Sequence, residues 1–285
     1  MLTPEELRQI GRLHVQVGRR VDALLAGEYR SAFRGSGMEF EEVRTYAPGD
    51  DIRRIDWNVT ARSGEPFLKV FREERELTML LVVDRSGSVR FGSGGRDGRT
   101  DKRLQIARLA GALSYAALRS GDRVGLLTFS DGVERFVPPR RSRGHAWQVI
   151  RSAYEALESD RGTQLGAALT HAQKVLKRRA AVIVLSDFQG PPAWQDAVRI
   201  LLRRHRVHAF LVHDPLEQAL PDLGLVTVRD AESGAVRTVD ASTWVAAVGL
   251  DRRLADLRRL GLRASAVSTR DDAFQRLHAH FRGSA

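Results

Sequence analysis

The sequence of 285 residues contains no cysteine, which excludes disulfide-stapled scaffolds, zinc–thiolate sites and thiol nucleophiles. It also lacks any apolar run near the roughly 20 residues that a membrane-spanning helix needs. Residues 1–20 have no apolar signal-peptide core and carry several charged side chains. We therefore expect a cytoplasmic protein without a membrane span.

Lysine is scarce, so arginine carries nearly all of the positive charge. The 46 Lys and Arg residues exceed the 35 Asp and Glu residues and give a formal net charge of +11. This excess has two explanations: the codon bias of a GC-rich genome, or an acidic partner such as nucleic acid or an anionic surface. Hydrophobic residues at 42% and charged residues at 28% argue for a folded globular chain rather than a disordered one.

The pattern along the chain predicts three parts. Residues 1–34 form a helical segment that starts at Thr3-Pro4, a capping hydroxyl followed by proline. Residues 35–76 form a small β annex, with extended stretches at 38–45 and 67–72 and a Pro-Gly turn at 48–49. Residues 77–285 form the main domain.

The main domain alternates between apolar strands and helices. This alternation predicts a doubly wound α/β fold, a mostly parallel sheet with helices on both faces. The predicted strands are 77–83, 124–129, 133–137, 182–185, 207–212 and 262–267, with a hairpin at 225–228 and 236–239. The predicted helices are 103–119, 145–157, 165–176, 194–203, 243–260 and a terminal one from 271.

Polar side chains gather where the buried strands end. Asp84, Ser86 and Ser88 follow the first strand, Thr163 precedes a helix, and Asp187 follows the strand at 182–185. The carboxyl ends of strands in an open α/β sheet converge on one crevice. An all-oxygen cluster of two carboxylates and three hydroxyls suits Mg²⁺ or Mn²⁺. Because two aspartates only just balance a divalent cation, the ion would have positions left for a carboxylate from outside.

Simpler explanations exist for each piece of this cluster. A lone Asp-x-Ser-x-Ser is most often an Asx turn or a helix cap, and a lone threonine after glycine is usually an N-cap. An aspartyl-phosphate phosphatase is also conceivable, but Ser86 stands where its second, acid–base aspartate belongs. The Gly-rich loop 93–100 lacks the first glycine and the lysine of a P-loop.

Two resemblances narrow the interpretation. Asp84-Arg85-Ser86-Gly87-Ser88 with Thr163 and Asp187 resembles the metal-ion-dependent adhesion site of von Willebrand factor type A domains, and the similarity extends over about residues 77–215. That resemblance implies that Asp84, Ser86 and Ser88 bind the metal directly. It implies that Thr163 and Asp187 bind it directly or through water.

The upstream segment is similar to a bacterial family known as domain of unknown function fifty-eight. The similarity lies in residues 37–57, Gly-Met-Glu-Phe-Glu-Glu-Val-Arg-Thr-Tyr-Ala-Pro-Gly-Asp-Asp-Ile-Arg-Arg-Ile-Asp-Trp, in 60–62 and in His213-Asp214-Pro215-Leu216-Glu217. Members of that family often accompany AAA+ ATPases of the MoxR type, which implies an adaptor or substrate-recruiting role. Many of its members carry N-terminal membrane helices, and this chain shows none.

The segment 44–62 is dense in alternating charges around two aromatic residues. It is either an internal ion-pair network or a docking surface, because arginine with aromatics is typical of interface hot spots. The carboxylates at 214 and 217 either reach the crevice rim or start a helix. The docking candidates are therefore Arg44, Tyr46, Asp50, Asp56, Trp57, Arg62, Asp214 and Glu217.

We expect a non-catalytic domain that binds protein partners through Mg²⁺ or Mn²⁺. The partner supplies an acidic residue and is a MoxR-type ATPase or its substrate. Two alternatives stay open: a nucleic-acid-binding protein of the same fold, and a metal-dependent phosphohydrolase. Loss of binding with salt would favour nucleic acid, and loss with a chelator would favour the metal-bridged complex.

Overall fold

The computed structural model describes residues 38–73, 77–92, 101–155, 162–190, 192–231, 233–244 and 249–282, together with Arg8 and Gly11. The chain divides into two compact units, a small one at 34–76 and a larger one built mainly from 77–285. The helix expected over 1–34 lies outside the described residues except for Arg8 and Gly11, which are both helical. The loop at 93–100 lies outside them as well.

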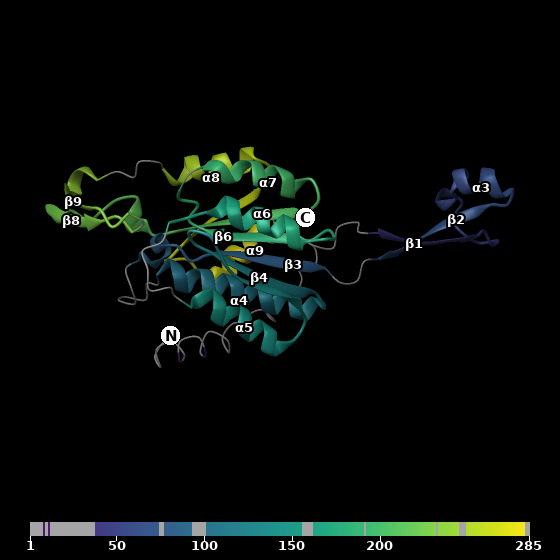
Figure 1. Ribbon diagram of the computed structural model, residues 1–285, viewed down its shortest axis with the longest axis horizontal. Coiled ribbons are helices and arrows are strands. Elements are labelled where there is room, and N and C mark those ends of the chain that lie inside the picture. Colours follow the sequence, from purple (N-terminus) through teal and green to yellow (C-terminus); the bar gives the residue numbers. More distant parts are fainter. Residues whose placement is uncertain are drawn as a thin grey trace. The chain divides into compact units, whose positions relative to one another are not determined.

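The larger unit contains a six-stranded sheet in the order β10-β7-β6-β3-β4-β5, of which Figure 1 labels the neighbouring strands β6, β3 and β4. All neighbours are parallel except β4 and β5, which form an antiparallel pair. The strands are β3 (Thr78–Asp84), β4 (Arg123–Phe129), β5 (Val133–Arg140), β6 (Ala181–Ser186), β7 (Arg206–His213) and β10 (Arg263–Ser268). A separate hairpin pairs β8 (Leu225–Arg229) with β9 (Val236–Asp240).

Helices cover both faces of this sheet. They are α4 (Lys102–Ser120), α5 (Arg143–Tyr154), α6 (Leu165–Val175), α7 (Gln195–Leu202), α8 (Leu250–Arg259) and α9 (Ala273–Arg282). Short 3-10 helices join them: η2 (Gly87–Arg90), η3 (Pro192–Trp194), η4 (Pro215–Glu217) and η5 (Ala241–Thr243).

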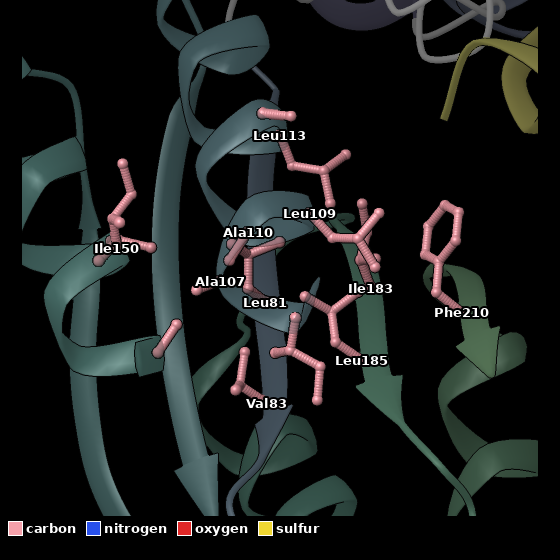
Figure 2. Packing of buried hydrophobic residues seen from close by; sticks show 14 of the residues in the cluster. Leu81, Val83, Ala107, Leu109, Ala110, Leu113, Ile150, Ile183, Leu185 and Phe210 are labelled. Carbon is pink, nitrogen blue, oxygen red and sulfur yellow. The ribbon is translucent and has the colours of Figure 1, made fainter. Parts of the chain in front are cut away.

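The central strands are apolar on both sides because both sides are buried. Leu81 and Val83 of β3 pack with α4, α5 and α9, as Figure 2 shows for the α4 contacts. Leu80 and Val82 alternate with them and pack with α6, α7 and α8 on the opposite face. The doubly wound arrangement follows from this alternation.

The predicted elements agree with the structure to within a few residues, with one exception. The expected helix 243–260 begins later than predicted, at Leu250, and residues 245–248 of that range lie outside the described part of the chain. The carboxylate of Asp240 caps the short η5, Trp244 is extended, and α8 begins only after Gly249, which is its N-cap. Capping side chains and an N-cap glycine thus divided a segment whose apolar spacing predicted one helix.

Strand β5 forms one edge of the described sheet, and it contains Pro138 and Pro139. Gly125 of β4 lies directly against Pro139, because a Cβ at residue 125 would come within 2.9 Å of the proline ring. Proline lacks the amide donor of a ladder and occurs in sheets mainly on edge strands. The sequence at this edge therefore fits its position.

The small unit is an antiparallel hairpin of β1 (Met38–Thr45) and β2 (Phe67–Glu73). Between these strands lie the 3-10 helix η1 (Ile52–Arg54) and the helix α3 (Trp57–Ser63). The Asp56 carboxylate caps α3, and Gly64 ends it in the left-handed conformation at φ 78°. The β annex predicted for 35–76 is thus present, and residues 52–62, for which the sequence allows either irregular or briefly helical structure, contain two short helices.

Candidate metal centre

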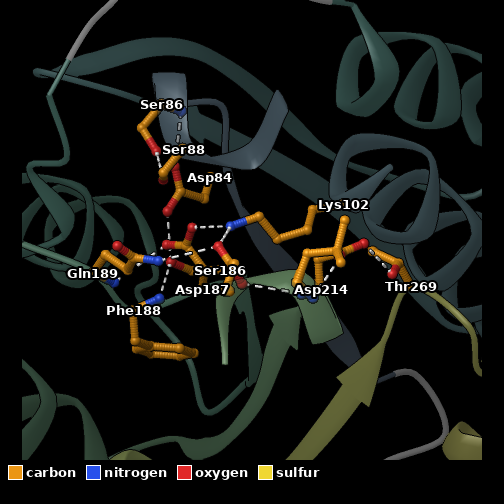
Figure 3. A network of polar contacts seen from close by, with 12 residues as sticks. Asp84, Ser86, Ser88, Lys102, Ser186, Asp187, Phe188, Gln189, Asp214 and Thr269 are labelled. Atoms are coloured by element: carbon orange, nitrogen blue, oxygen red, sulfur yellow. Dashed lines mark hydrogen bonds and ion pairs between the residues drawn. The ribbon is translucent and has the colours of Figure 1, made fainter. Parts of the chain in front are cut away.

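The carboxyl ends of β3 and β6 bring two aspartates to one edge of the sheet. Asp84 is the last residue of β3, and Asp187 follows β6 directly. The two strands are parallel neighbours, so their ends coincide. The Ser186 hydroxyl donates to Asp84 Oδ2 at 2.5 Å and thereby links the two strand ends (Figure 3).

The turn after β3 adds two more hydroxyls to this edge. The Ser86 amide donates to Asp84 Oδ1 at 2.9 Å, which closes an Asx turn. The Ser86 and Ser88 hydroxyl oxygens are 3.1 Å apart at the start of η2. Asp84 therefore forms the Asx turn that the simpler explanation predicted. The turn also brings three oxygen-bearing side chains together.

Asp187 is paired with a cation that the sequence analysis missed. The Lys102 ammonium lies 2.7 Å from Asp187 Oδ2 and also contacts Glu217 Oε1 (Figure 3 shows Lys102 beside Asp187). The Lys102 side chain is fully buried. Gln189 completes the group. Its backbone amide donates to Asp187 Oδ1 at 3.2 Å, and its side-chain amide donates to Glu217 Oε1 at 3.3 Å.

The loop after β6 packs closely against Thr163. Gly190 has φ +101°, and a Cβ there would lie 3.3 Å from the Thr163 carbonyl oxygen. The Gln164 amide donates to the Ser130 carbonyl at 2.6 Å and ties this segment to the end of β4. Thr163 is buried, like the other four predicted ligands. All five therefore lie at the carboxyl edge of the sheet.

The chain is strained immediately after Asp187. Phe188 has φ +53°, and among the described residues it is the one non-glycine residue with positive φ. This left-handed conformation is costly for a bulky residue. Two contacts hold it: the Phe188 amide donates to the Ser186 hydroxyl at 2.9 Å, and the ring packs edge-on against Trp194. The surroundings therefore fix the direction in which the chain leaves Asp187.

The two aspartates have opposite electrostatic environments. Burial and the nearby charge of Asp187 raise the pKa of Asp84 to about 7. Burial also acts against ionisation of Asp187, but the charge and hydrogen bond of Lys102 outweigh it and lower the pKa of that carboxyl. For Lys102, burial is outweighed by Asp187 and Glu217, so the pKa of the ammonium is raised. Asp84 is thus the carboxylate that has a negative neighbour and no paired ammonium.

Burial contradicts the prediction of Asp214 as a docking residue, whereas Glu217 is half-buried and its docking role stays a prediction. Asp214 is buried at 1% exposure, and its Oδ2 accepts a hydrogen bond from the Thr269 hydroxyl at 2.6 Å. The two carboxylates form a capping box at the start of η4. The alternative of a helix-start pair is therefore correct, and Glu217 additionally reaches the polar cluster through Lys102.

The docking candidates of the small unit fall into two groups. Arg44 and Asp50 form an ion pair at 2.6 Å. Asp56 is mostly buried and pairs with Lys69 at 3.0 Å, so it is a structural residue and not a docking residue. Tyr46 is half-buried.

Trp57 and Arg62, by contrast, are exposed on α3. Trp57 is 67% exposed and does not anchor a core. The ion-pair explanation therefore holds for Arg44, Asp50 and Asp56, and docking by the exposed Trp57 and Arg62 stays a prediction.

The donors at the sheet edge fit a small, hard cation. All five candidates offer oxygen, which Mg²⁺ and Mn²⁺ prefer. The 3.1 Å between the Ser86 and Ser88 hydroxyls matches neighbouring ligands of an octahedral ion, which are about 3 Å apart for bonds of about 2.1 Å. Among the described residues no group of three or more His, Asp or Glu side chains could hold a metal. A site here would depend on hydroxyls.

A mostly parallel sheet with helices on both faces and a polar cluster at its carboxyl edge places the larger unit in the doubly wound α/β class, as expected from the sequence. The chain belongs to the family described as "Protein of unknown function DUF58", whose model matches residues 42–253. It is 34% identical to the uncharacterized protein Rv1480 of Mycobacterium tuberculosis over 236 residues, covering 82% of this chain and 73% of the relative. Uncharacterized protein Mb1516 of Mycobacterium bovis gives the same values.

Two solved structures share the fold. One is conserved hypothetical protein BatB from Bacteroides thetaiotaomicron, with a TM-score of 0.51, 17% identity, and coverage of 73% of this chain and 98% of that one. The other is an aerotolerance-related membrane protein from Bacteroides fragilis, with a TM-score of 0.51, 16% identity and the same coverage. Within the part of this chain that the structure describes, no helix has the length and apolar content needed to cross a bilayer.

Proposed function

We propose that this protein is a non-catalytic interaction domain that binds Mg²⁺ or Mn²⁺ and, through the metal, an acidic residue of a protein partner. The proposal rests on the environment of the Asp84 carboxylate. This carboxylate is buried at 1% exposure next to the Asp187 charge, and the hydroxyls of Ser86 and Ser88 lie beside it. A divalent cation there would remove the cost of burying the Asp84 charge.

The partner would approach from the side of Ser88 and Thr163. Each is 6% exposed, whereas Ser86 and Asp187 are completely buried. Neutral hydroxyls contribute no charge to the metal, so a carboxylate is the preferred group to complete its coordination. An exposed aspartate or glutamate on a protruding partner segment would supply it.

The family resemblance suggests what the partner is. Because members of the family often accompany MoxR-type AAA+ ATPases, the first candidate partner is such an ATPase or its substrate. This protein would then be the adaptor. Nothing about the cluster calls for catalysis. Ser86 stands two residues after Asp84, where a phosphatase would carry its acid–base carboxylate, so we expect no hydrolysis of generic phosphoesters. The cytoplasmic location stays a prediction.

The test combines metal binding with partner capture. Calorimetry should detect Mg²⁺ or Mn²⁺ binding to the wild type at millimolar concentration and none to Asp84→Ala. The exposed Asp222→Ala variant is the matched control, because it removes one carboxylate away from the cluster. A candidate ATPase should be retained by the wild type in Mg²⁺ and released by chelator. An absence of metal binding to the wild type would refute the proposal.

A second candidate function has one observation in its favour. Basic residues gather at the amino ends of β6, β7 and β10: burial and the neighbouring Arg179 and Arg263 lower the pKa of Arg206. Such a cluster of guanidinium groups suits phosphates. If nucleic acid is the partner, its affinity should fall steeply with salt, remain in chelator, and drop in Arg179→Ala.

A further inference from the structure

Lys102 is a cation in the interior of the protein, at the centre of the polar cluster. Its ammonium touches one carboxylate from the loop after β6 and another from η4, namely Asp187 and Glu217. We infer that Lys102 is a permanent internal cation that sets the charge of the cluster, so that a single divalent ion neutralises it. This inference rests on the proposed function and deepens it, because it names the residue that determines which cation charge the site accepts.

The position of Lys102 in the fold indicates that its role is electrostatic. Lys102 is the first residue of α4, and a positive charge at the amino end of a helix opposes the helix dipole. A buried ion pair is also rarely more stable than apolar side chains of the same volume. Neither the helix nor the core gains from an ammonium at this position. The groups that gain from it are the carboxylates that face it.

The two aspartates are therefore not equivalent ligands. Both Asp187 oxygens are engaged within the protein, one by Lys102 and the other by the Gln189 amide. Asp84 accepts hydrogen bonds from the Ser86 amide and from the Ser186 and Ser86 hydroxyls, all of which are uncharged donors. Within the proposed site, Asp84 is therefore the aspartate whose charge is not already paired with an ammonium of the protein.

The charges of the cluster can be counted. Asp84, Asp187 and Glu217 carry three negative charges when ionised, and Lys102 carries one positive charge. The sum is minus two, so one Mg²⁺ or Mn²⁺ makes the cluster neutral, whereas a trivalent ion would leave an excess positive charge. Without Lys102 the sum would be minus three. Lys102 thus holds the affinity for divalent ions below what three carboxylates would otherwise give.

The experiment measures metal affinity in variants that change the cluster charge in opposite directions. Lys102→Met keeps an unbranched side chain, one atom shorter, and removes the ammonium. Glu217→Gln removes one negative charge and keeps an oxygen that can face Lys102. Lys174→Met, at an exposed position of α6, is the matched control for the loss of one lysine. Calorimetry with Mg²⁺ and with Mn²⁺ gives the affinities, and urea unfolding in chelator shows whether each variant is folded.

Lys102→Met should bind both metals about tenfold more tightly or better, since it removes a unit charge close to the ion, and Glu217→Gln should bind them about tenfold more weakly. Lys174→Met should match the wild type. If the wild type binds metal and both cluster variants stay within about twofold of it, or shift in the same direction, the inference is refuted. If Lys102→Met does not fold, the Glu217→Gln result decides.

Failure of the proposed function gives a different pattern. It is refuted when the wild type binds neither metal. In that case, metal binding by Lys102→Met alone would still support a charge-setting role of Lys102, because the ammonium would lower the affinity of the wild type below the measured range. Absence of binding in Lys102→Met as well would refute both.

Discussion

Replacing Asp84 by asparagine should stabilise the metal-free protein, although it removes a predicted metal ligand. In the folded state the carboxyl has a pKa of about 7, raised by burial and by the charge of Asp187, whereas an unfolded aspartate titrates near 3.9. A raised folded-state pKa means that the stability contributed by this group is complete below about pH 4 and is lost as the pH rises towards 7. Asparagine does not titrate, so it avoids that loss.

The magnitude follows from the width of the pH interval. Between about pH 5 and pH 7 the unfolded carboxyl is ionised and the folded one is mostly protonated. Each pH unit then costs the wild type about 1.4 kcal/mol. The advantage of Asp84→Asn should therefore grow by about 3 kcal/mol over this interval. The amide can still accept from the Ser86 amide and donate to the Ser186 hydroxyl, so the turn should survive.

Urea unfolding followed by circular dichroism at pH 5 and pH 8, with chelator present, measures this difference. Asp222→Asn, at an exposed position, should follow the wild type at both pH values. Magnesium should narrow the difference at pH 8, because it stabilises only the wild type, by about 2.7 kcal/mol at a hundredfold excess over Kd. A variant that is less stable than the wild type at both pH values in chelator would refute the reasoning about Asp84.

Three further predictions concern other parts of the molecule. Ser86→Ala combined with Ser88→Ala should weaken Mg²⁺ binding in calorimetry yet leave a cooperative unfolding transition, since both side chains lie in the turn after β3; unchanged affinity would exclude the hydroxyls as ligands. Burial lowers the pKa of His208 to about 3 and that of His280 to about 4. The stability that these two neutral rings contribute is therefore complete above pH 6.5, the ordinary histidine pKa of the unfolded chain. It is lost as the pH falls below 6.5, by about 2 kcal/mol per ring at pH 5. The measurement should be made in the Asp84→Asn variant, because Asp84 in the wild type adds stability as the pH falls and would mask the histidine effect. A stability that does not change between pH 6.5 and 5 would contradict this prediction. Trp57→Ala should change the free energy of unfolding by less than about 0.5 kcal/mol, because the ring is 67% exposed, and it should weaken binding of a partner that docks on α3; a larger loss of stability would mean that the indole packs against the protein.

The sequence predicted the features that depend on local pattern. The strands β3 and β6 could be located because both of their faces are buried and their apolar runs are nearly continuous. Asp84 and Asp187 could be placed together because the ends of neighbouring parallel strands meet. The hairpin β8–β9 and the turn at Gly49 also followed from residue type.

Features that depend on distant partners were not predictable in this way. Lys102 pairs with Asp187 and Glu217, which lie 85 and 115 positions further along the chain, and no local pattern marks such a pair. The lysine at the start of a helix, where the dipole disfavours a cation, was the one available signal. Trp57 was open to two explanations, because the exposure of an aromatic side chain depends on what the rest of the chain brings near it.

The proline pair in β5 has a consequence for self-association. Pro138 and Pro139 lie at an irregularity of the β4–β5 ladder, opposite Gly125, and neither has an amide hydrogen to donate. A second molecule that tried to continue the ladder at this edge would find a missing donor at that point. Edge-to-edge stacking is the common route from a native sheet to aggregation. At its β5 edge, the protein therefore carries a built-in barrier against forming an intermolecular sheet at high concentration.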